Sequence, residues 1–176
     1  MKRRFEDDHN WETEQYKQAW FPTLMADAFP DAEGWRQEDD PDRQRAGVDI
    51  ETWGTSNHEQ WTYAIDFKWR REYWPDILVE VTSNDQTGTG GWAVKDQLTD
   101  YLAYMWVSVS TGYFIPFKYL QAALLEHGDD WLSEFGEVTS DNAADFGDYT
   151  THNLPIPIPV MLRNVPNCFR VRWENP

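Results

Sequence analysis

The chain has 176 residues and a formal net charge of −16 at neutral pH, from 31 acidic and 15 basic side chains. Its length suits one domain with a sizeable core, and its 16% aromatic content, with 11 Trp, excludes a disordered tail. The negative charge argues against a surface that binds nucleic acid through phosphates alone, because such surfaces are normally basic. It fits a soluble acidic surface or a high-salt cytoplasm equally well.

The cysteine content and the N-terminal sequence bear on the compartment. A single cysteine, Cys168, excludes an internal disulfide and a cysteine-based zinc site. Residues 1–5 run directly into acidic side chains, so we expect no signal peptide. The longest apolar stretch, 101–117, is interrupted by Ser, Thr and Gly and makes a poor membrane span. We therefore expect an intracellular protein.

The N-terminal part is predicted to hold one helix and one loop. After a polar lead over residues 1–10, apolar side chains at helical spacing predict a helix over 11–28. Asn10 is its expected N-cap, and Pro30 ends it. The following residues, 30–45, are rich in Asp, Glu, Gly and Pro and predict a loop.

The middle of the chain is predicted to be mainly β-structure. Alternating apolar residues predict strands over 46–53 and 61–70, joined as a hairpin. A third strand is expected over 76–81, completing a three-stranded meander. A flexible Gly-rich loop over 85–91 then leads into a second predicted helix over 94–105.

The remaining elements complete an α/β fold. We expect a strand over 106–117, a helix over 118–135 and an extended, Pro-rich segment over about 150–176 with an edge strand near 169–173. Together these elements predict a single domain over 1–176, with its core in about 10–135. Its mixed sheet, a meander plus a further strand, would be flanked by helices.

Two acids and a lysine are predicted to converge on the hairpin. Gly47-Val48-Asp49 lies on its first strand and Asp66-Phe67-Lys68 on its second. Because side chains alternate along a strand, Asp66 and Lys68 point to the same face. A divalent metal and a phosphate would fit two carboxylates beside an amine. The alternative is a solvent-facing side of the sheet with a cross-strand ion pair, since about one acid-x-Lys triplet is expected by chance in a chain of this composition.

On these residues the chain resembles the PD-(D/E)XK nuclease superfamily. Gly47-Val48-Asp49 matches the first acid of the pattern, and Asp66-Phe67-Lys68 matches the acid-x-Lys. The likeness covers about residues 10–110, and it is nearer to compact phage and archaeal nucleases, Holliday-junction resolvases included, than to large restriction enzymes. Val48 departs from the family's Pro. The resemblance implies a restriction-endonuclease-like core, cleavage of DNA, branched DNA among its substrates, and a homodimer.

The resemblance also implies a role for each residue of the motif. Asp49, Asp66 and the backbone carbonyl of Phe67 would hold Mg²⁺ or Mn²⁺. Lys68 would orient the attacking water and stabilise charge on the phosphate. The direction of any shift in the lysine pKa stays open, because burial lowers it and carboxylate neighbours raise it.

Two further acids are candidates for the same site. Glu12 lies on the predicted helix over 11–28, where family members often place a Glu near the metal; the alternative is an exposed acid favoured by the helix dipole. Glu80 lies among apolar residues of the strand over 76–81, and its alternative is a solvent-facing strand residue.

Five residues are candidates for contact with DNA. Lys95 lies at the start of the predicted helix over 94–105, where free backbone N–H groups favour anions. Gln97 and Tyr101 share a face of that helix and resemble a Gln-x-x-x-Tyr element of some family members; the alternative is a core Tyr beside an exposed Gln. Arg45 and Arg70 flank the acidic motifs.

The sequence therefore predicts a metal-dependent deoxyribonuclease, either a branched-DNA resolvase or a phage-type endonuclease. Two other classes stay open. One is an acidic protein that mimics DNA and occupies a nucleic-acid-binding partner, which the charge of −16 would suit. The other is a structural or assembly protein on a nuclease-like fold.

Overall fold

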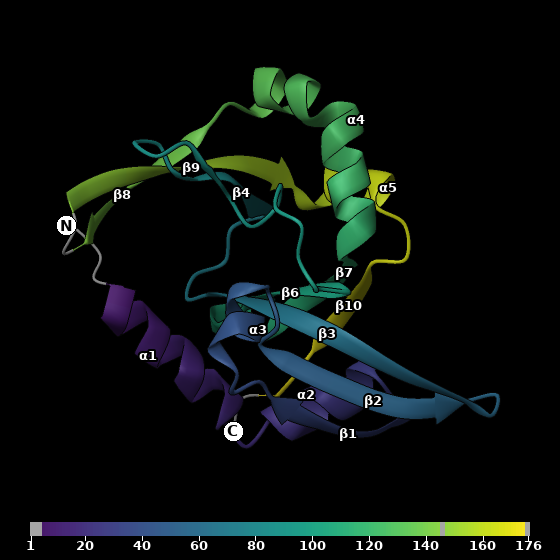
Figure 1. Ribbon diagram of the computed structural model, residues 1–176. Helices are drawn as coiled ribbons and strands as arrows, with labels where there is room; N and C mark the ends of the chain where they lie inside the picture. Colours follow the sequence, from purple (N-terminus) through teal and green to yellow (C-terminus); the bar gives the residue numbers. More distant parts are fainter. Residues whose placement is uncertain (1–4, 145–146, 175–176) are drawn as a thin grey trace. The chain divides into compact units, whose positions relative to one another are not determined.

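The computed structural model describes residues 5–144 and 147–174. The chain forms two compact units, named here by their sheets (Figure 1). The six-stranded unit comprises Gln18–Tyr73, Asp96–Tyr119 and Val165–Pro176, and the four-stranded unit comprises Met1–Lys17, Trp74–Lys95 and Leu120–Asn164. Each unit is assembled from three separate segments of the chain. The single domain expected over 1–176 stays a prediction.

The larger sheet is mixed, which confirms the predicted α/β class. Its strands β3 and β6 are parallel, and its other neighbouring pairs are antiparallel. In spatial order they are β1 (Ala32–Gln37), β2 (Ile50–Ser56), β3 (Glu59–Arg70), β6 (Tyr101–Trp106), β7 (Thr111–Pro116) and β10 (Phe169–Arg172).

The hairpin of β2 and β3 is confirmed, with a tighter turn than predicted. Only Asn57 and His58 connect the strands, with φ angles of 52° and 68°. Two positive φ angles characterise a type I′ turn, whose twist matches that of paired strands. The register places Ile50 opposite Ile65 and Glu51 opposite Ala64.

One face of this sheet packs on α2 (Phe21–Ala28). The Phe21 ring lies 5.5 Å from Phe67 on β3 and 5.2 Å from Trp35 on β1. Ile65, Phe67 and Trp69, which alternate along β3, are all buried on this side. Asp66 and Lys68 therefore lie on the opposite face of the sheet.

The continuous helix predicted over 11–28 is wrong. The structure has α1 over Phe5–Tyr16 and α2 over Phe21–Ala28, so the proposed N-cap Asn10 lies inside α1. The reason is Pro22, which lacks a backbone N–H and is tolerated only in the first turn of a helix. It occupies the first turn of α2.

The predicted loop over 30–45 instead contains β1 and the short helix α3 (Pro41–Arg45). The Asp40 side chain caps α3 by accepting the N–H of Asp42 at 2.8 Å. An Asp cap followed by Pro at the first helical position is a strong start signal. Gly34 lets β1 approach β2, since a Cβ there would meet the Trp53 ring at 2.7 Å.

The helix predicted over 94–105 is wrong as well. Asp96 to Asp100 are irregular, and Tyr101–Trp106 forms β6, a central strand between β3 and β7. Its residues from Leu102 onward are buried whichever way they point. A short apolar run buried on both faces carries no strand alternation, which explains the error. The strand predicted over 106–117 is shorter: a 3₁₀ turn, Val107–Val109, separates β6 from β7.

The predicted three-stranded meander is also incorrect. Strand β4 (Asp76–Asn84) does not join β3 but belongs to the smaller sheet. The edge of β3 pairs in parallel with β6 instead, and the intervening chain forms the parallel crossover that such a pair requires.

The four-stranded unit contains an antiparallel sheet in which Ile77, Val79, Leu154 and Ile156 are buried. Its strand order is β5 (Thr89–Gly90), β4, β9 (Gly147–Pro157) and β8 (Val138–Ala144), and its other elements are α1, most of α4 (Phe117–Phe135) and α5 (Ile158–Asn164).

The C-terminal predictions are confirmed in part. The helix predicted over 118–135 is α4, and the predicted edge strand is β10, at one edge of the larger sheet. The segment expected to be extended over 150–176 is interrupted by α5, and residues 175–176 lie outside the described part of the chain. Among the described residues, no helix is long and apolar enough to cross a membrane.

Candidate functional site

Asp49 and Asp66 face each other where β2 begins. Asp49 donates its N–H to the carbonyl of Ile65 at 2.9 Å, although the register partner of Ile65 is Ile50, so this bond lies outside the regular β2–β3 pairing. Its carboxylate Oδ2 accepts the backbone N–H of Phe67 at 2.8 Å. Both bonds hold Asp49 beside the strand segment that carries Asp66, as the sequence predicts.

Lys68 lies on the same face of β3 as Asp66, two residues further along. Its Nζ is 2.7 Å from Asp66 Oδ1, and the lysine side chain is 33% exposed. The alternation predicted from the sequence is thereby confirmed, whereas the ion pair lies along β3 and is not the cross-strand pair of the alternative. The pair is not solvent-facing, because the Asp66 side chain is only 3% exposed.

Burial makes the Asp66 carboxylate costly to ionise. Desolvation raises the pKa of Asp66 to about 7, the Lys68 charge lowers it, and the neighbouring Asp49 carboxylate raises it again. The ammonium therefore compensates only part of the cost of two adjacent carboxylates. Either a proton or a cation at this point relieves the repulsion.

One oxygen of this buried carboxylate has no donor. Asp66 Oδ1 accepts from Lys68, whereas Oδ2 is inaccessible to solvent and has no hydrogen-bond partner among the described residues. Buried carboxylate oxygens are normally hydrogen-bonded or bound to metal. Divalent cations such as Mg²⁺ take oxygen ligands, so the carboxylates of Asp66 and the adjacent Asp49 are the groups that could hold one.

Phe67 completes the candidate ligand set through its backbone. Its N–H points toward Asp49, and in a strand the carbonyl of a residue points to the same edge as its N–H. Phe67 lies beyond the paired part of the hairpin at this edge, because β2 starts only at Ile50, opposite Ile65. The site thus offers two carboxylates and a backbone carbonyl. Among the described residues, no group of three or more His, Cys, Asp or Glu side chains could hold a metal ion.

The turn before Asp49 is braced from one side by residues 97–99. Gly47 has a φ of 81°, in the left-handed region that favours glycine. The Thr99 hydroxyl donates to the Gly47 carbonyl at 2.6 Å, and the Leu98 N–H bonds the carbonyl of Ala46 at 2.9 Å. A Cβ on Gly47 would collide with the side chains of Gln97 and Thr99.

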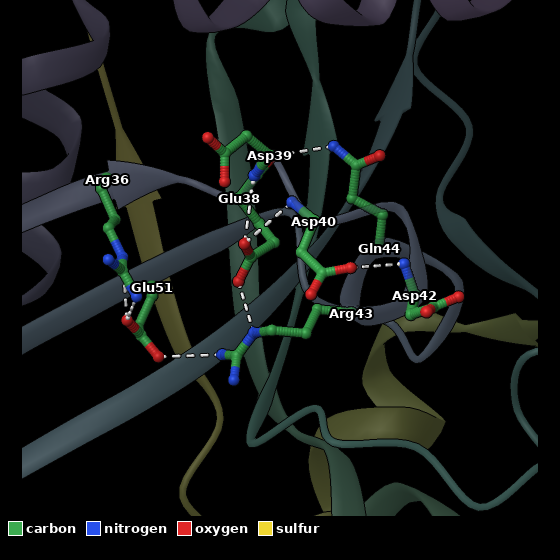
Figure 2. A network of polar contacts seen from close by, with 8 residues as sticks. All are labelled: Arg36, Glu38, Asp39, Asp40, Asp42, Arg43, Gln44 and Glu51. Carbon is green, nitrogen blue, oxygen red and sulfur yellow. Dashed lines mark hydrogen bonds and ion pairs between the residues drawn. The ribbon is translucent and has the colours of Figure 1, made fainter.

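A polar network joins residues 36–44 to Glu51 on β2 (Figure 2). Glu38, 6% exposed, accepts the N–H groups of Asp39 and Asp40 on Oε1, both at 3.1 Å, and Arg43 Nε on Oε2 at 2.5 Å. Arg43 also donates to Glu51 Oε1 at 2.9 Å. The other Glu51 oxygen accepts from Arg36 at 2.7 Å.

Glu38, Arg43 and Glu51 are not among the functional candidates predicted from the sequence. Glu38 and Arg43 fall in the predicted loop over 30–45 and Glu51 in the predicted strand over 46–53, although Asp40-Pro41 is a helix start signal that would have placed Arg43 on a helix. Nothing in the sequence indicates that Glu38 is buried.

Glu12 and Glu80 lie in the four-stranded unit, whereas Asp49, Asp66 and Lys68 lie in the six-stranded unit. Their participation in one site stays a prediction. The continuous helix expected to carry Glu12 is wrong, because α1 ends at Tyr16 and α2 begins at Phe21. Glu80 is half-buried on β4 opposite Asn153.

The five candidate DNA contacts are dispersed. Arg45 is exposed and paired with Asp42, Arg70 is half-buried at the end of β3, and Lys95 is exposed in the four-stranded unit. The helical face predicted for Gln97 and Tyr101 does not exist. Gln97 lies against Gly47, and the Tyr101 ring packs 5.2 Å from Tyr63, so burial raises the pKa of Tyr101.

Comparison of the chain with family models, with curated proteins and with solved structures finds no match.

Proposed function

We propose that this protein is a nuclease that hydrolyses DNA phosphodiester bonds with Mg²⁺ or Mn²⁺ held by Asp49 and Asp66. The observation that carries the proposal is the buried Asp66 carboxylate, which has a donorless oxygen beside Asp49 and an ion pair to Lys68. A site made only for stability would pair or replace such a group, because uncompensated buried charge destabilises the folded state.

Each of the three residues would have a distinct task. Asp49 and Asp66 would hold the cation together with the Phe67 carbonyl, and the cation would supply Lewis acidity and an activated water. Lys68 has part of its side chain in solvent and would donate from Nζ to a phosphate oxygen as negative charge develops there. Asp66 Oδ1 fixes the lysine for that task at 2.7 Å.

The cation also changes the sign of the net charge at the site. Without it, two carboxylates and one ammonium leave the site net negative, which repels phosphate; with it, the site is net positive. The six-stranded unit holds 9 of the 15 basic residues and 15 of the 31 acidic ones, so it is the less acidic of the two units. Metal binding would therefore precede binding of DNA.

A cleavage assay with matched variants tests the proposal. Labelled linear duplex, single-stranded DNA, four-way junction and RNA are incubated with Mg²⁺ or Mn²⁺ and with wild type, Asp66→Asn or Lys68→Met. Glu59→Gln, on an exposed position of the same strand, and Lys118→Met are the controls for loss of one charge.

We expect wild type and both controls to cleave DNA, and the site variants to lose about 10²-fold or more in rate. Preference for the four-way junction over linear duplex would assign the resolvase sub-class. Wild type that is inert on every substrate with both metals would refute the proposal, and the acidic DNA-mimic class would then be tested by competition with DNA for a DNA-binding protein.

A further inference from the structure

Glu38 is a buried acid outside the proposed catalytic set, in the connection between β1 and α3. Its carboxylate has three donors, the N–H groups of Asp39 and Asp40 and the Arg43 guanidinium. The Asp40 N–H is the largest cause that holds the pKa of Glu38 below its usual value; burial opposes it, and Arg43 reinforces it. Acids are rarely buried without such complete pairing, so this carboxylate is held in one defined place.

The backbone groups of Glu38 and of its ion-pair partner Arg43 are hydrogen-bonded to Asp49 and to the preceding residue, Val48. The Glu38 N–H donates to the Asp49 carbonyl at 2.8 Å. The carbonyl of Arg43, the partner of Glu38, accepts the N–H of Val48 at 3.1 Å. The Glu38–Arg43 ion pair therefore joins two chain segments, one bonded to the peptide group that follows the Asp49 Cα and the other to the peptide group that precedes the Val48 Cα.

Arg43 extends the connection to the strand that follows Asp49. Its guanidinium bridges Glu38 Oε2 and Glu51 Oε1, as Figure 2 shows. Glu51 is the second residue of β2, and Asp49 directly precedes that strand. Arg43 and Arg36 together hold the Glu51 carboxylate.

We propose that the Glu38–Arg43 pair is a positioning device for the metal-binding carboxylate of Asp49. The inference rests on the proposed function, since it concerns the same cation. Glu38 does not touch the cation; it acts through the backbone of Asp49. Residues that orient metal ligands in this way commonly change metal affinity by about 10–100-fold when they are replaced.

Helix α3, which carries Arg43, supplies a matched control for a purely local charge effect. Asp42 forms an ion pair with Arg45, and both side chains are highly exposed, at 87% and 72%. Exposed pairs contribute little to stability. Asp42→Asn removes one negative charge from the segment 38–45, as Glu38→Gln does, but leaves the bonds to Asp49 and Val48 intact.

The experiment measures the Mn²⁺ dissociation constant by titration calorimetry in about 0.15 M salt, which screens unspecific attraction to the acidic surface. Wild type, Glu38→Gln, Arg43→Lys and Asp42→Asn are compared at a temperature at which circular dichroism shows each to be folded. Arg43→Lys keeps the charge but loses the fork that joins Glu38 to Glu51, and it provides a milder variant should Glu38→Gln fail to fold.

We expect the dissociation constant to rise about 10–100-fold in Glu38→Gln, less in Arg43→Lys, and by less than about twofold in Asp42→Asn. Saturating Mn²⁺ should restore the cleavage rate of Glu38→Gln but not that of Lys68→Met, a result that general structural damage would not produce. Wild-type affinity in both Glu38→Gln and Arg43→Lys would overturn the inference and leave the proposed function standing. Absence of Mn²⁺ binding by wild type would overturn both.

Discussion

Replacing Asp66 by Asn should make the metal-free protein more stable at neutral and alkaline pH. The amide has the shape of the carboxyl group but no charge to desolvate, and its N–H₂ can donate to Asp49 as the protonated acid does. The Lys68 ammonium keeps a carbonyl acceptor, and its side chain is one-third exposed, so water can compensate for the lost ion pair.

The magnitude follows from the pKa of Asp66, which is about 7 in the folded protein instead of 3.8. Between these values the folded state holds a proton that the unfolded state has lost, so stability falls as pH rises and levels off above about pH 7. The full shift of the Asp66 pKa, from 3.8 to about 7, corresponds to a loss of about 4 kcal/mol in unfolding free energy, at 1.36 kcal/mol per pH unit. Protonation of Glu38, whose pKa is lowered, acts in the opposite direction at acid pH.

The assay is urea unfolding of wild type and Asp66→Asn at a series of pH values from 4 to 9, in chelator and then in Mn²⁺. Subtracting one curve from the other cancels the other titrating groups, and Glu59→Gln controls for the change in net charge. We expect the difference in unfolding free energy to favour Asp66→Asn increasingly from pH 4 to about 7, by a few kcal/mol. Mn²⁺ should stabilise wild type only, by about 2.7 kcal/mol at a hundredfold excess over the dissociation constant.

The claim that the buried Asp66 carboxylate is destabilising would be refuted if the difference in unfolding free energy between wild type and Asp66→Asn did not vary with pH. It would equally be refuted if Asp66→Asn were less stable than wild type at pH 8 in chelator, because Asp66 would then be a stabilising member of its ion pair.

Two further predictions concern other residues. Gly47→Ala should destabilise the protein by more than about 1 kcal/mol, because a Cβ at this positive φ would collide with Gln97 and Thr99. Gly88→Ala is the control and should destabilise it less, since Gly88 has a similar φ of 67° but open space around it. Equal losses of unfolding free energy in urea would contradict the bracing of the turn at Gly47. Burial raises the pKa of the Cys168 thiol to about 12, so it should react with iodoacetamide at pH 8 far more slowly in the native protein than in urea, and equal rates would contradict its burial.

The hairpin and the relation of its acidic motifs could be predicted because they depend on local rules. Alternation along a strand placed Asp66 and Lys68 on one face, and apolar residues such as Phe67 on the other. Pairing of consecutive strands then brought Asp49 to the same point. Each inference requires only neighbours in sequence or a short turn.

The errors arose where tertiary context or a single residue overrides a periodic pattern. Residues 94–105 contain apolar side chains at helical spacing, yet Tyr101–Trp106 becomes a central strand because both of its faces are buried. Pro22 breaks the long helix that the apolar pattern predicts. The allocation of β4 to a second sheet depends on long-range pairing with β9, which no local signal specifies.

The positioning network illustrates a further limit. Glu38 lies in a run of acidic residues, 38–40, that predicts a solvated loop, and two neighbours, Asp39 and Asp40, are indeed exposed. The burial of Glu38 within this run depends on Arg43, which lies on α3, and on the strand that carries Glu51. Composition alone cannot select it.

The central claim, that Asp49 and Asp66 hold a divalent cation, is tested most directly by anomalous diffraction from a crystal of the protein soaked in Mn²⁺. The account predicts an anomalous peak within coordination distance of a carboxylate oxygen of Asp49 and of Asp66 Oδ2, absent from crystals of Asp66→Asn. An Mn²⁺-soaked crystal with no peak between these two carboxylates, or with Asp66 Oδ2 bonded to a protein donor instead, would contradict it.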